Sequence, residues 1–526
     1  MRSRAALVLA FLVLLIPSAQ FAWRNSDMPD FGRLHDDGLM FVTAQSIAHG
    51  EGYRIPSLPE NPYQTKYPPL FPAYLSLAWM LNPSFPGNLA TVTVLVWPWL
   101  VVCLALAWAL YRKDGLPPAR ALLLTAALGL SPYMVLFGSL MLSEVFFTCF
   151  LLTTLLLARR SGNGAILLAG LAAACAYLSR TAGIALVVSV PAILVWKRDW
   201  RRAGLFLATS LPAVVAWSWW SRAHLPQSHD MSLLYYLDYM ALEKATIGFD
   251  NFGIVLWKNI DQILYSMGSL VLPKVMAILP LKILTQMIAV AMLAGVVRMV
   301  RRGIAVDYAT FGLLSLGILA VWHYPPTERF VLPLFPLLLA GLVSELDHLA
   351  SMLRKALRHK DASQRVVAVI FAAGTAGVVA GAVGLQMYMT FRMLNEVAAQ
   401  ERSEAAERRA DYQWMARNLP AGANVLSNDD ALLYLTSGHR GNWMMLMPRW
   451  WYADDKESVI NAYKNAAPYC RRRGLEYLYS TPDDLARFSE GRDIDQVLAA
   501  VRSDPQLKPV LSNSAGTLYR VSPRSK

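Results

Sequence analysis

The hydrophobic positions of this 526-residue chain gather into long runs, and most charged positions fall between those runs. A helix needs roughly 20 mostly apolar residues to cross a bilayer. We therefore predict an α-helical polytopic membrane protein with about eleven transmembrane helices, the shorter of which neighbouring loop residues should extend. The expected ranges are Ala5 to Trp23, Leu89 to Leu110, Ala119 to Phe137, Leu142 to Ala158, Gly164 to Leu178, Ala182 to Trp196, Ala203 to Trp220, Met276 to Val297, Tyr308 to Trp322, Phe330 to Val343 and Val366 to Met389.

Basic residues occur in every second connection between these runs. Cytoplasmic loops carry an excess of Lys and Arg, so the basic connections are expected inside. The N-terminus is then inside, and eleven spans place the C-terminus outside together with the loops 24–88 and 221–261. The basic sets are Arg2/Arg4, Arg112/Lys113/Arg120, Arg159/Arg160, Lys197/Arg198/Arg201/Arg202, Arg298/Arg301/Arg302 and Lys355/Arg358/Lys360/Arg365.

Two segments leave alternatives open. The N-terminus has a basic start, an apolar core and small residues near its end, so a cleaved signal peptide is the alternative to an anchor helix. Its apolar run is long for a signal core, which favours the anchor. The run Ile263 to Val275 is interrupted by Pro273 and Lys274, and we expect it to be interfacial or re-entrant.

The pattern changes after Met389. A charged helical stretch is followed by a short β-like run, Asn424 to Ser427, and a second helix; "GLEYLYSTPDD" and "GTLYRVS" are further expected strands. We therefore predict two domains: 1–390 in the membrane and 391–526 as a small extracytoplasmic α/β domain. Residues 391–526 contain no phosphate-binding Gly-rich motif, nucleophile elbow or metal-ligand spacing.

Composition and charge support the membrane assignment. Hydrophobic residues make up 55% of the chain and charged residues 16%, well below the quarter that is usual in soluble proteins. The net charge of +13 lies in the short loops and follows the positive-inside rule, so it does not predict nucleic-acid binding. Three of the four cysteines lie in apolar runs, and their spacing indicates neither a disulfide framework nor a metal site.

The first outer loop contains the densest set of candidate functional residues. Asp36 and Asp37 follow His35 and open the pattern "DDGLMFVTAQSIAHGEGY", which predicts a short amphipathic helix on the membrane surface. Asp is a preferred N-cap residue, so one acid could cap this helix while the other faces a cavity. Further on, "KYPPLFP" contains Lys66 and Tyr67 before a proline-rich turn.

Other charged residues are expected at outer helix ends and turns. They are Glu144 in "MLSEVFF", Arg180 in "YLSRTAG", and Glu328 and Arg329 in "WHYPPTERFVLPLFP", which also contains His323. Charges at such depth often mark a site or a pathway, and the alternative is snorkelling or a structural Glu–Arg pair. Their shared outer location predicts one site at the outer membrane boundary.

The order of these motifs resembles the GT-C superfamily of membrane glycosyltransferases, in particular bacterial relatives of the protein O-mannosyltransferases and the lipid A aminoarabinose transferase. The resemblance covers roughly Ala5 to Val343 and is sharpest between Asp36 and Pro72. Asp36 matches the family Asp and Asp37 its Glu, while Met40 stands where the family has an aromatic residue. The basic-Pro-Pro element is matched by Lys66 with Pro68-Pro69, with Tyr67 inserted.

The resemblance implies a glycosyltransferase in the bacterial cytoplasmic membrane that passes a sugar from a polyprenyl phosphate to a lipid, glycan or protein acceptor at the outer face. Asp36 or Asp37 would be the base, and the other would orient it or hold a divalent cation; no cofactor is required by the pattern. Arg329, Arg180 and Lys66 would bind the donor phosphate. Glu144, Glu328, Tyr67 and His323 would line the substrate cavity.

Two other classes of function remain open at this point. A transporter or flippase of lipid-linked sugars would also need charges within the membrane, although transporters commonly have inverted repeats and broken helices, and neither is visible here. A non-catalytic assembly partner acting through its C-terminal domain fits the absence of motifs there. It leaves the acids of the first loop unexplained.

Overall fold

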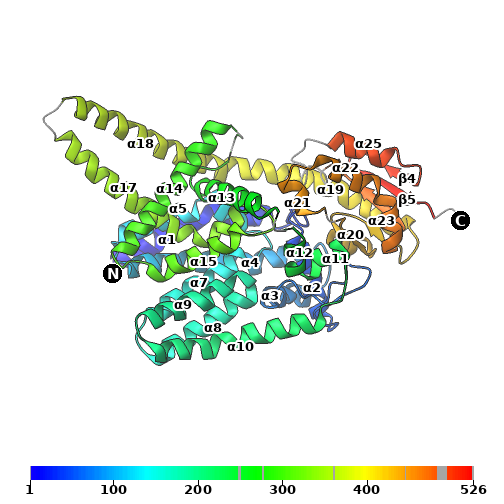
Figure 1. Cartoon of the computed structure of the whole chain (residues 1–526), viewed down its shortest axis with the longest axis horizontal. Helices are drawn as coiled ribbons and strands as arrows, with labels where there is room; N and C mark the ends of the chain where they lie inside the picture. Colours follow the sequence, from blue (N-terminus) through cyan, green and yellow to red (C-terminus); the bar gives the residue numbers. More distant parts are fainter. Residues whose placement is uncertain are drawn as a thin grey trace. The chain divides into compact units, whose positions relative to one another are not determined.

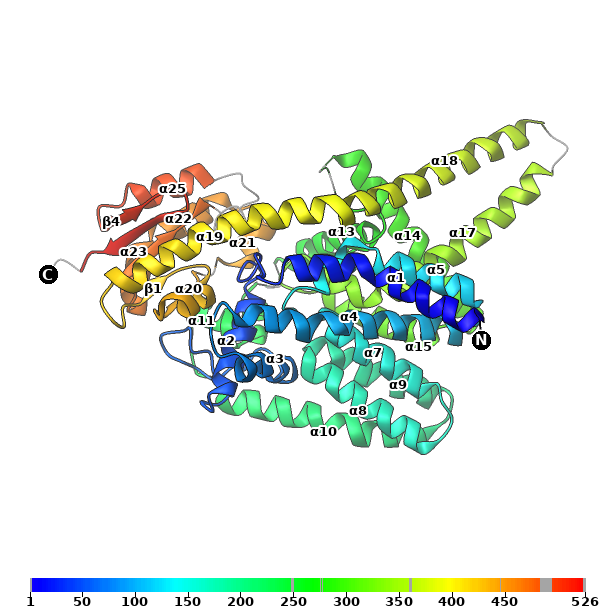
Figure 2. The same ribbon diagram turned by 180° about the vertical axis from the view of Figure 1, so that it is seen from behind.

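The computed structural model describes residues 2–246, 250–274, 276, 278–358, 362–444, 446–482 and 494–523. The chain is mostly helical with a small mixed sheet near its C-terminus (Figures 1 and 2). Its contacts divide it into two compact units. The first unit comprises Met1–Arg24, Val96–Val215 and Trp257–Glu396; the second comprises Asn25–Leu95, Ala216–Leu256 and Val397–Lys526.

Six helical stretches in the described residues are long and apolar enough to cross a membrane, judged by length and composition. They are α1 (Arg2–Arg24), α4 (Asn88–Lys113), α10 (Trp200–His224), α14 (Leu279–Arg301), the run Glu328–Leu357 that joins α16 (Glu328–Val331), η2 (Leu332–Leu334) and α17 (Phe335–Leu357), and the run Ala362–Asn418 that joins α18 (Ala362–Tyr388), η3 (Met389–Met393) and α19 (Leu394–Asn418). Shorter apolar helices are α3 (Leu70–Leu81), α5 (Pro118–Gly129), α7 (Glu144–Ala158), α8 (Asn163–Ser179), η1 (Thr181–Gly183) with α9 (Ile184–Trp196), and α15 (Val306–Ala320).

Each of the eleven predicted ranges is mostly helical in the described residues, but one of them is interrupted by residues outside any helix. The range Ala119 to Phe137 forms α5 and then α6 (Pro132–Phe137), with Leu130 and Ser131 between them. Pro132 explains the break, because its ring disfavours a helical conformation at Ser131 while its fixed φ suits the first turn of a new helix. The number of actual membrane crossings stays a prediction. Residues 275, 277 and 360 of the predicted segments, and the final acids of "GLEYLYSTPDD", lie outside the described residues.

Small residues set the close packing of the first unit. The helices α7, α8 and α9 lie side by side (Figures 1 and 2), and α14 packs along α17. Where α14 meets α17, a Cβ at Gly295 would lie 1.8 Å from the carbonyl oxygen of Gly341. Only glycine lets two helix backbones approach this closely, an arrangement common in membrane proteins.

The second unit contains a five-stranded sheet in the order β2-β1-β3-β5-β4. Its strands are β1 (Val425–Leu426), β2 (Gly441–Asn442), β3 (Tyr477–Ser480), β4 (Leu507–Ser512) and β5 (Thr517–Val521). The first three strands of this order are parallel, and β5 pairs antiparallel with both β3 and β4. All three expected β segments are therefore confirmed by β1, β3 and β5.

Helices complete the second unit. They are α2 (Asp36–Ala48), α3, α11 (Met231–Leu237), α12 (Tyr239–Thr246), α20 (Asp430–Ser437), α21 (Pro448–Tyr452), α22 (Lys456–Lys464), α23 (Ala466–Arg473) and α25 (Ile494–Arg502), with α13 (Phe252–Ser269) and α19 extending from it. The first loop thus packs in one unit with residues 397–526. The division into domains 1–390 and 391–526 stays a prediction.

Candidate functional site

The two acids of the first loop follow a tight turn at the start of α2. His35 has φ 64° and ψ −42°, and the Asp36 N–H donates a hydrogen bond to the Leu34 carbonyl at 2.7 Å. A bond from residue i+2 to residue i with a positive φ between them is a γ-turn of the rare, strained kind. The helix begins at Asp36, and His35 in the N-cap position makes no capping side-chain bond. The expectation that an Asp is the N-cap is therefore wrong, although both acids still face the positive end of the helix dipole.

The helix α2 exists as predicted, but it is not a surface helix. Leu39 and Val42 are buried, and so are Thr43 and Ser46 on the side that the sequence marked as polar. Thr43 satisfies its hydroxyl by donating to the Leu39 carbonyl at 2.7 Å, which is why a polar residue fits there. The amphipathic, membrane-surface assignment is wrong because α3 and α20 pack against α2.

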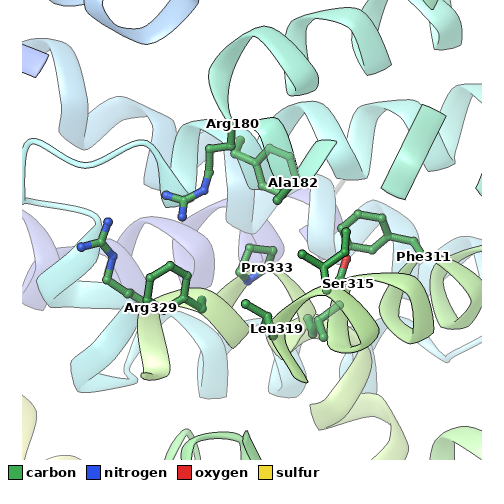
Figure 3. A pocket seen from close by; sticks show the side chains of 11 residues that line it. Arg180, Ala182, Phe311, Ser315, Leu319, Arg329 and Pro333 are labelled. Atoms are coloured by element: carbon green, nitrogen blue, oxygen red, sulfur yellow. The ribbon is translucent and has the colours of Figure 1, made fainter. Parts of the chain in front are cut away.

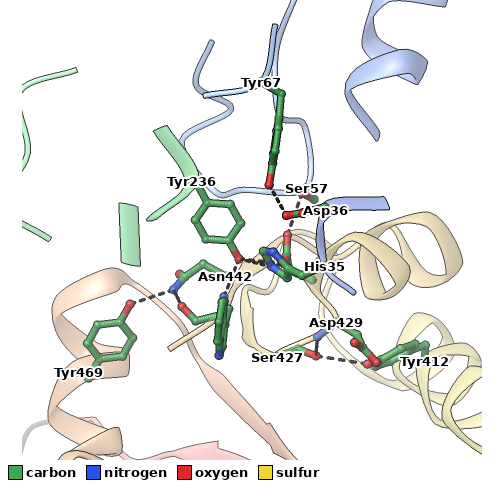
Figure 4. Close-up of polar contacts among 12 residues, drawn as sticks. His35, Asp36, Ser57, Tyr67, Tyr236, Tyr412, Ser427, Asp429, Asn442 and Tyr469 are labelled. Carbon is green, nitrogen blue, oxygen red and sulfur yellow. Dashed lines mark hydrogen bonds and ion pairs between the residues drawn. The ribbon is translucent and has the colours of Figure 1, made fainter. Parts of the chain in front are cut away.

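Asp36 is paired with a tyrosine from the same loop. The Tyr67 hydroxyl donates a hydrogen bond to Asp36 Oδ1 (Figure 4). Burial raises the pKa of Tyr67 well above its ordinary value, and the neighbouring Asp36 charge adds to that rise, so the phenol keeps its proton and remains a donor. Asp36 itself is only half-buried. This carboxylate is thus oriented by one partner and still reachable.

Asp37 has a different environment. It is buried, and its Oδ2 accepts the Gly32 N–H at 2.9 Å. Burial raises the pKa of Asp37 to about 6, the Gly32 and Gly38 backbone N–H groups oppose that rise, and the charge of Asp36 makes a smaller contribution to it. Two adjacent carboxyl groups with separate environments can take separate roles, as acid–base pairs in enzymes do.

Lys66 lies in a cage of tyrosine rings. Its Nζ is 3.8 Å from the ring centroid of Tyr235, 4.3 Å from that of Tyr239 and 4.8 Å from that of Tyr67. These cation–π contacts stabilise the buried ammonium group. Gln64 fixes the chain here, because its Oε1 accepts the N–H groups of both Lys66 and Tyr67. The second unit therefore contains four predicted site residues, Asp36, Asp37, Lys66 and Tyr67, and Tyr67 contacts both Asp36 and Lys66.

A residue that the sequence analysis missed anchors the turn before Asp36. Asp430, the first residue of α20, is fully buried, and its Oδ1 lies 2.9 Å from His35 Nε2 and 2.8 Å from the Tyr236 hydroxyl. Its Oδ2 accepts the Ser57 hydroxyl at 2.9 Å. Figure 4 shows the His35 ring next to the Tyr236 hydroxyl, which lies 3.3 Å from His35 Nε2. The only sequence signal was a second pair of adjacent acids opening a helix, and nothing local connects that pair to His35.

Three other predicted residues meet in the first unit. Glu144 is fully buried; its Oε1 accepts a hydrogen bond from Arg329 Nε at 2.7 Å and forms an ion pair with Arg180 Nη1 at 2.6 Å. Arg180 Nη1 also donates to the Ser143 hydroxyl at 3.2 Å. Two guanidinium groups thus share one carboxylate, and the trio keeps one net positive charge.

The two arginines border a pocket of about 40 Å³ (Figure 3). The remaining lining is mostly apolar: Phe147, Ala182, Phe311, Ile318, Leu319, Phe330, Pro333 and Leu334, with Ser315 as a further polar residue. The pocket is too small for more than a few water molecules, so the feature that suits an anionic ligand is the pair of arginines at its edge.

The remaining predicted residues of the first unit lie elsewhere. Glu328 pairs with Lys274 Nζ at 2.6 Å and accepts the Ser269 hydroxyl at 2.7 Å, so it is not the partner of its neighbour Arg329. His323 is buried, with its ring against those of Trp322 and Tyr324. In the described parts of the chain, no group of three or more His, Cys, Asp or Glu side chains is arranged to hold a metal ion.

Comparisons with known proteins show the fold. No protein-family model matches the sequence, and no curated protein matches it. Among solved structures, ArnT from Cupriavidus metallidurans bound to undecaprenyl phosphate is 13% identical, with a TM-score of 0.54 over 97% of this chain and 97% of that one. The same protein in the apo state has a TM-score of 0.51 at 13% identity, over 99% and 98% of the two chains. The Archaeoglobus fulgidus oligosaccharyltransferase in the apo form has a TM-score of 0.52 at 13% identity, over 97% of this chain and 74% of that one.

These likenesses confirm the GT-C resemblance at the level of the fold. They extend over nearly the whole chain, whereas the motifs of the sequence reach only to Val343. Together with the long apolar helices, they identify the chain as a multi-pass membrane protein.

Proposed function

We propose that this protein is a glycosyltransferase that passes a sugar from a polyprenyl-phosphate donor to a hydroxyl group of a lipid, glycan or protein acceptor. The observation that supports this proposal most directly is the half-buried Asp36 carboxylate, oriented by the Tyr67 hydroxyl, in a chain with a GT-C-like fold. ArnT, whose structure has a similar fold, was crystallised with undecaprenyl phosphate bound. The reaction belongs at the outer face of a bacterial cytoplasmic membrane, with the N-terminus inside and about eleven spans.

Asp36 is the proposed base. An acceptor hydroxyl becomes a better nucleophile as a carboxylate takes its proton during attack, and such a step contributes about 10²- to 10⁴-fold to a rate. Asp36 is reachable, whereas Asp37 is buried against the Gly32 N–H. Asp37 is better suited to orienting the turn that presents Asp36. If a divalent cation takes part, these two carboxylates are the proposed ligands.

Arg329 and Arg180 are the proposed phosphate-binding residues. A leaving phosphate needs positive charge rather than a proton, and the fork of an arginine matches phosphate oxygens in two places. The trio with Glu144 retains one net positive charge beside an apolar pocket, which supports this assignment. Glu144 then holds the two guanidinium groups in position.

The other predicted residues take supporting roles in this proposal. Lys66 is a second candidate for the phosphate, and its tyrosine cage keeps the ammonium group fixed. Tyr67 orients Asp36. Glu328, through Lys274, fixes the segment next to Arg329, and His323 is proposed to line the cavity.

The test compares envelope glycolipids and glycoproteins of wild-type and deletion cells by mass spectrometry, followed by complementation with Asp36→Asn. Asn can still accept the Tyr67 hydrogen bond but cannot take a proton, so the variant should remain folded and lose at least about 100-fold in transfer. A wild-type pattern in the deletion strain would contradict the proposal. If the acceptor is unglycosylated in the deletion strain and Asp36→Asn restores its glycosylation as well as the wild-type protein does, the result would favour a transporter of lipid-linked sugars instead.

A further inference from the structure

We propose that Asp430 is a positioning residue of the candidate site: by holding His35, it fixes the strained turn that presents Asp36. The inference rests on the proposed function, because it assigns a role within the same site. It also gives the C-terminal residues a part in the reaction, although they contain no catalytic motif of their own.

The first step of the argument is the set of donors around Asp430. The fully buried Asp430 carboxylate contacts His35 and Ser57 from the first loop and Tyr236 from the loop 221–261. A buried carboxylate is unfavourable unless such donors surround it. Asp430 therefore ties two outer loops to the start of α20, and one of its three contacts falls on His35, the residue next to Asp36.

The second step is backbone strain. The γ-turn at His35 lies in a sparsely populated region of φ/ψ space, where a residue other than glycine is strained. Such a conformation persists only when surrounding contacts enforce it. His35 Nε2 lies 2.9 Å from Asp430 Oδ1 and 3.3 Å from the Tyr236 hydroxyl, which is itself bonded to Asp430, so Asp430 is the centre of the contacts that hold this ring. Relaxation of this turn would rotate the Asp36 side chain away from Tyr67.

The third step is the close packing of α20 on α2. A Cβ at Gly38 would lie only 2.7 Å from Ala431 Cβ, so glycine is required where the two helices meet. The Gly441 N–H also donates to the Ser57 carbonyl at 2.9 Å. The contact between the first loop and residues 430–441 is thus built from side chains and backbone together, which makes a rigid support for Asp36.

The test measures turnover of the full-length protein in detergent, with separate kcat and donor KM values. Asp430→Asn should lower kcat by about 10- to 100-fold, because displacement of a catalytic group by about 1 Å can reduce a rate by that much. The donor KM should stay within about threefold. The matched control is Asp411→Asn, which removes another buried carboxylate of the same unit, bonded to Tyr479 and Asn513, and should leave kcat unchanged.

Three variants of His35 keep the test decisive if Asp430→Asn folds poorly. His35→Gln can still donate to Asp430 and should retain most of the kcat that His35→Ala loses. His35→Gly relieves the backbone strain but lacks the contact, so its kcat should also fall. If His35→Gly or a folded Asp430→Asn turns over like wild type, or if the Asp411→Asn control falls equally in kcat, the positioning role is refuted.

A spectroscopic readout separates this inference from the proposed function. With 3-fluorotyrosine at position 67, the ¹⁹F resonance reports the hydrogen bond to Asp36 without any need for turnover. Asp430→Asn and His35→Ala should shift that resonance, and Asp411→Asn should not. A protein that shows these shifts but transfers no sugar would refute the proposed function, and it would support the structural coupling of Asp430 to the hydrogen bond between Tyr67 and Asp36. If the wild-type protein transfers sugar, and Asp430→Asn changes neither the ¹⁹F resonance nor kcat, only the positioning role is refuted.

Discussion

Replacement of Arg329 by lysine tests whether the guanidinium group of Arg329 binds the donor phosphate. The substitution keeps the positive charge but removes the separate nitrogen atoms of the guanidinium group. In the wild type, Nε donates to Glu144 at 2.7 Å, and the side chain borders the pocket. A single lysine ammonium can neutralise Glu144 or meet a phosphate, but it cannot reproduce a bidentate contact while it does both.

The expected loss follows from the contacts removed. A hydrogen bond to a charged group contributes about 1.5–3 kcal/mol, which corresponds to a 10- to 150-fold weaker donor affinity at about 1.4 kcal/mol per factor of ten. The Arg329 side chain is 9% exposed, so screening by solvent reduces this figure little. We expect Arg329→Lys to weaken donor binding within that range and Arg329→Ala to weaken it further.

The assay is a donor titration next to a thermal melt of each variant. The matched control is Arg298→Lys, since Arg298 also donates two bonds to a carboxylate, Glu345, but is 30% exposed and lies away from the pocket. This control should leave both donor affinity and melting temperature nearly unchanged. A lower melting temperature of Arg329→Lys with wild-type donor affinity would show that Arg329 only holds Glu144. The phosphate role would then pass to Arg180 or Lys66.

Two further predictions address stability and topology. The raised pKa of Asp37 means that the folded chain retains a proton which the unfolded chain releases between about pH 4 and 6, so stability should fall by up to about 3 kcal/mol as the pH rises through that window. Asp37→Asn should remove this dependence in thermal melts at pH 4 to 7; equal slopes for wild type and variant would contradict it. A reporter fused after Ser522 should be active outside the cytoplasm, because the basic loops place the C-terminus there. A cytoplasmic signal would overturn the proposed orientation.

The apolar runs predicted the helices well because the physical cause is local. A run of about 20 apolar residues is enough to specify a membrane helix, whatever lies elsewhere in the chain. Of the two failures, the first has a tertiary cause and the second a local one. The helix α2 was expected at the membrane surface, yet the packing of α3 and α20 buries Thr43 and Ser46 as fully as Leu39. Pro132 divided one predicted span although the hydrophobic pattern continued through it.

The same distinction between local and tertiary causes applies to the candidate site. By itself, the sequence determined the helical class, three of the C-terminal strands and the identity of the exceptional charges, because a charge within an apolar run is conspicuous. Only the tertiary structure decided the partners: Arg329 binds Glu144 rather than its neighbour Glu328. It also joined His35 to Asp430 across 395 positions. Periodicity and composition describe what each segment prefers, whereas such a contact depends on how segments pack, and no local pattern encodes that distance.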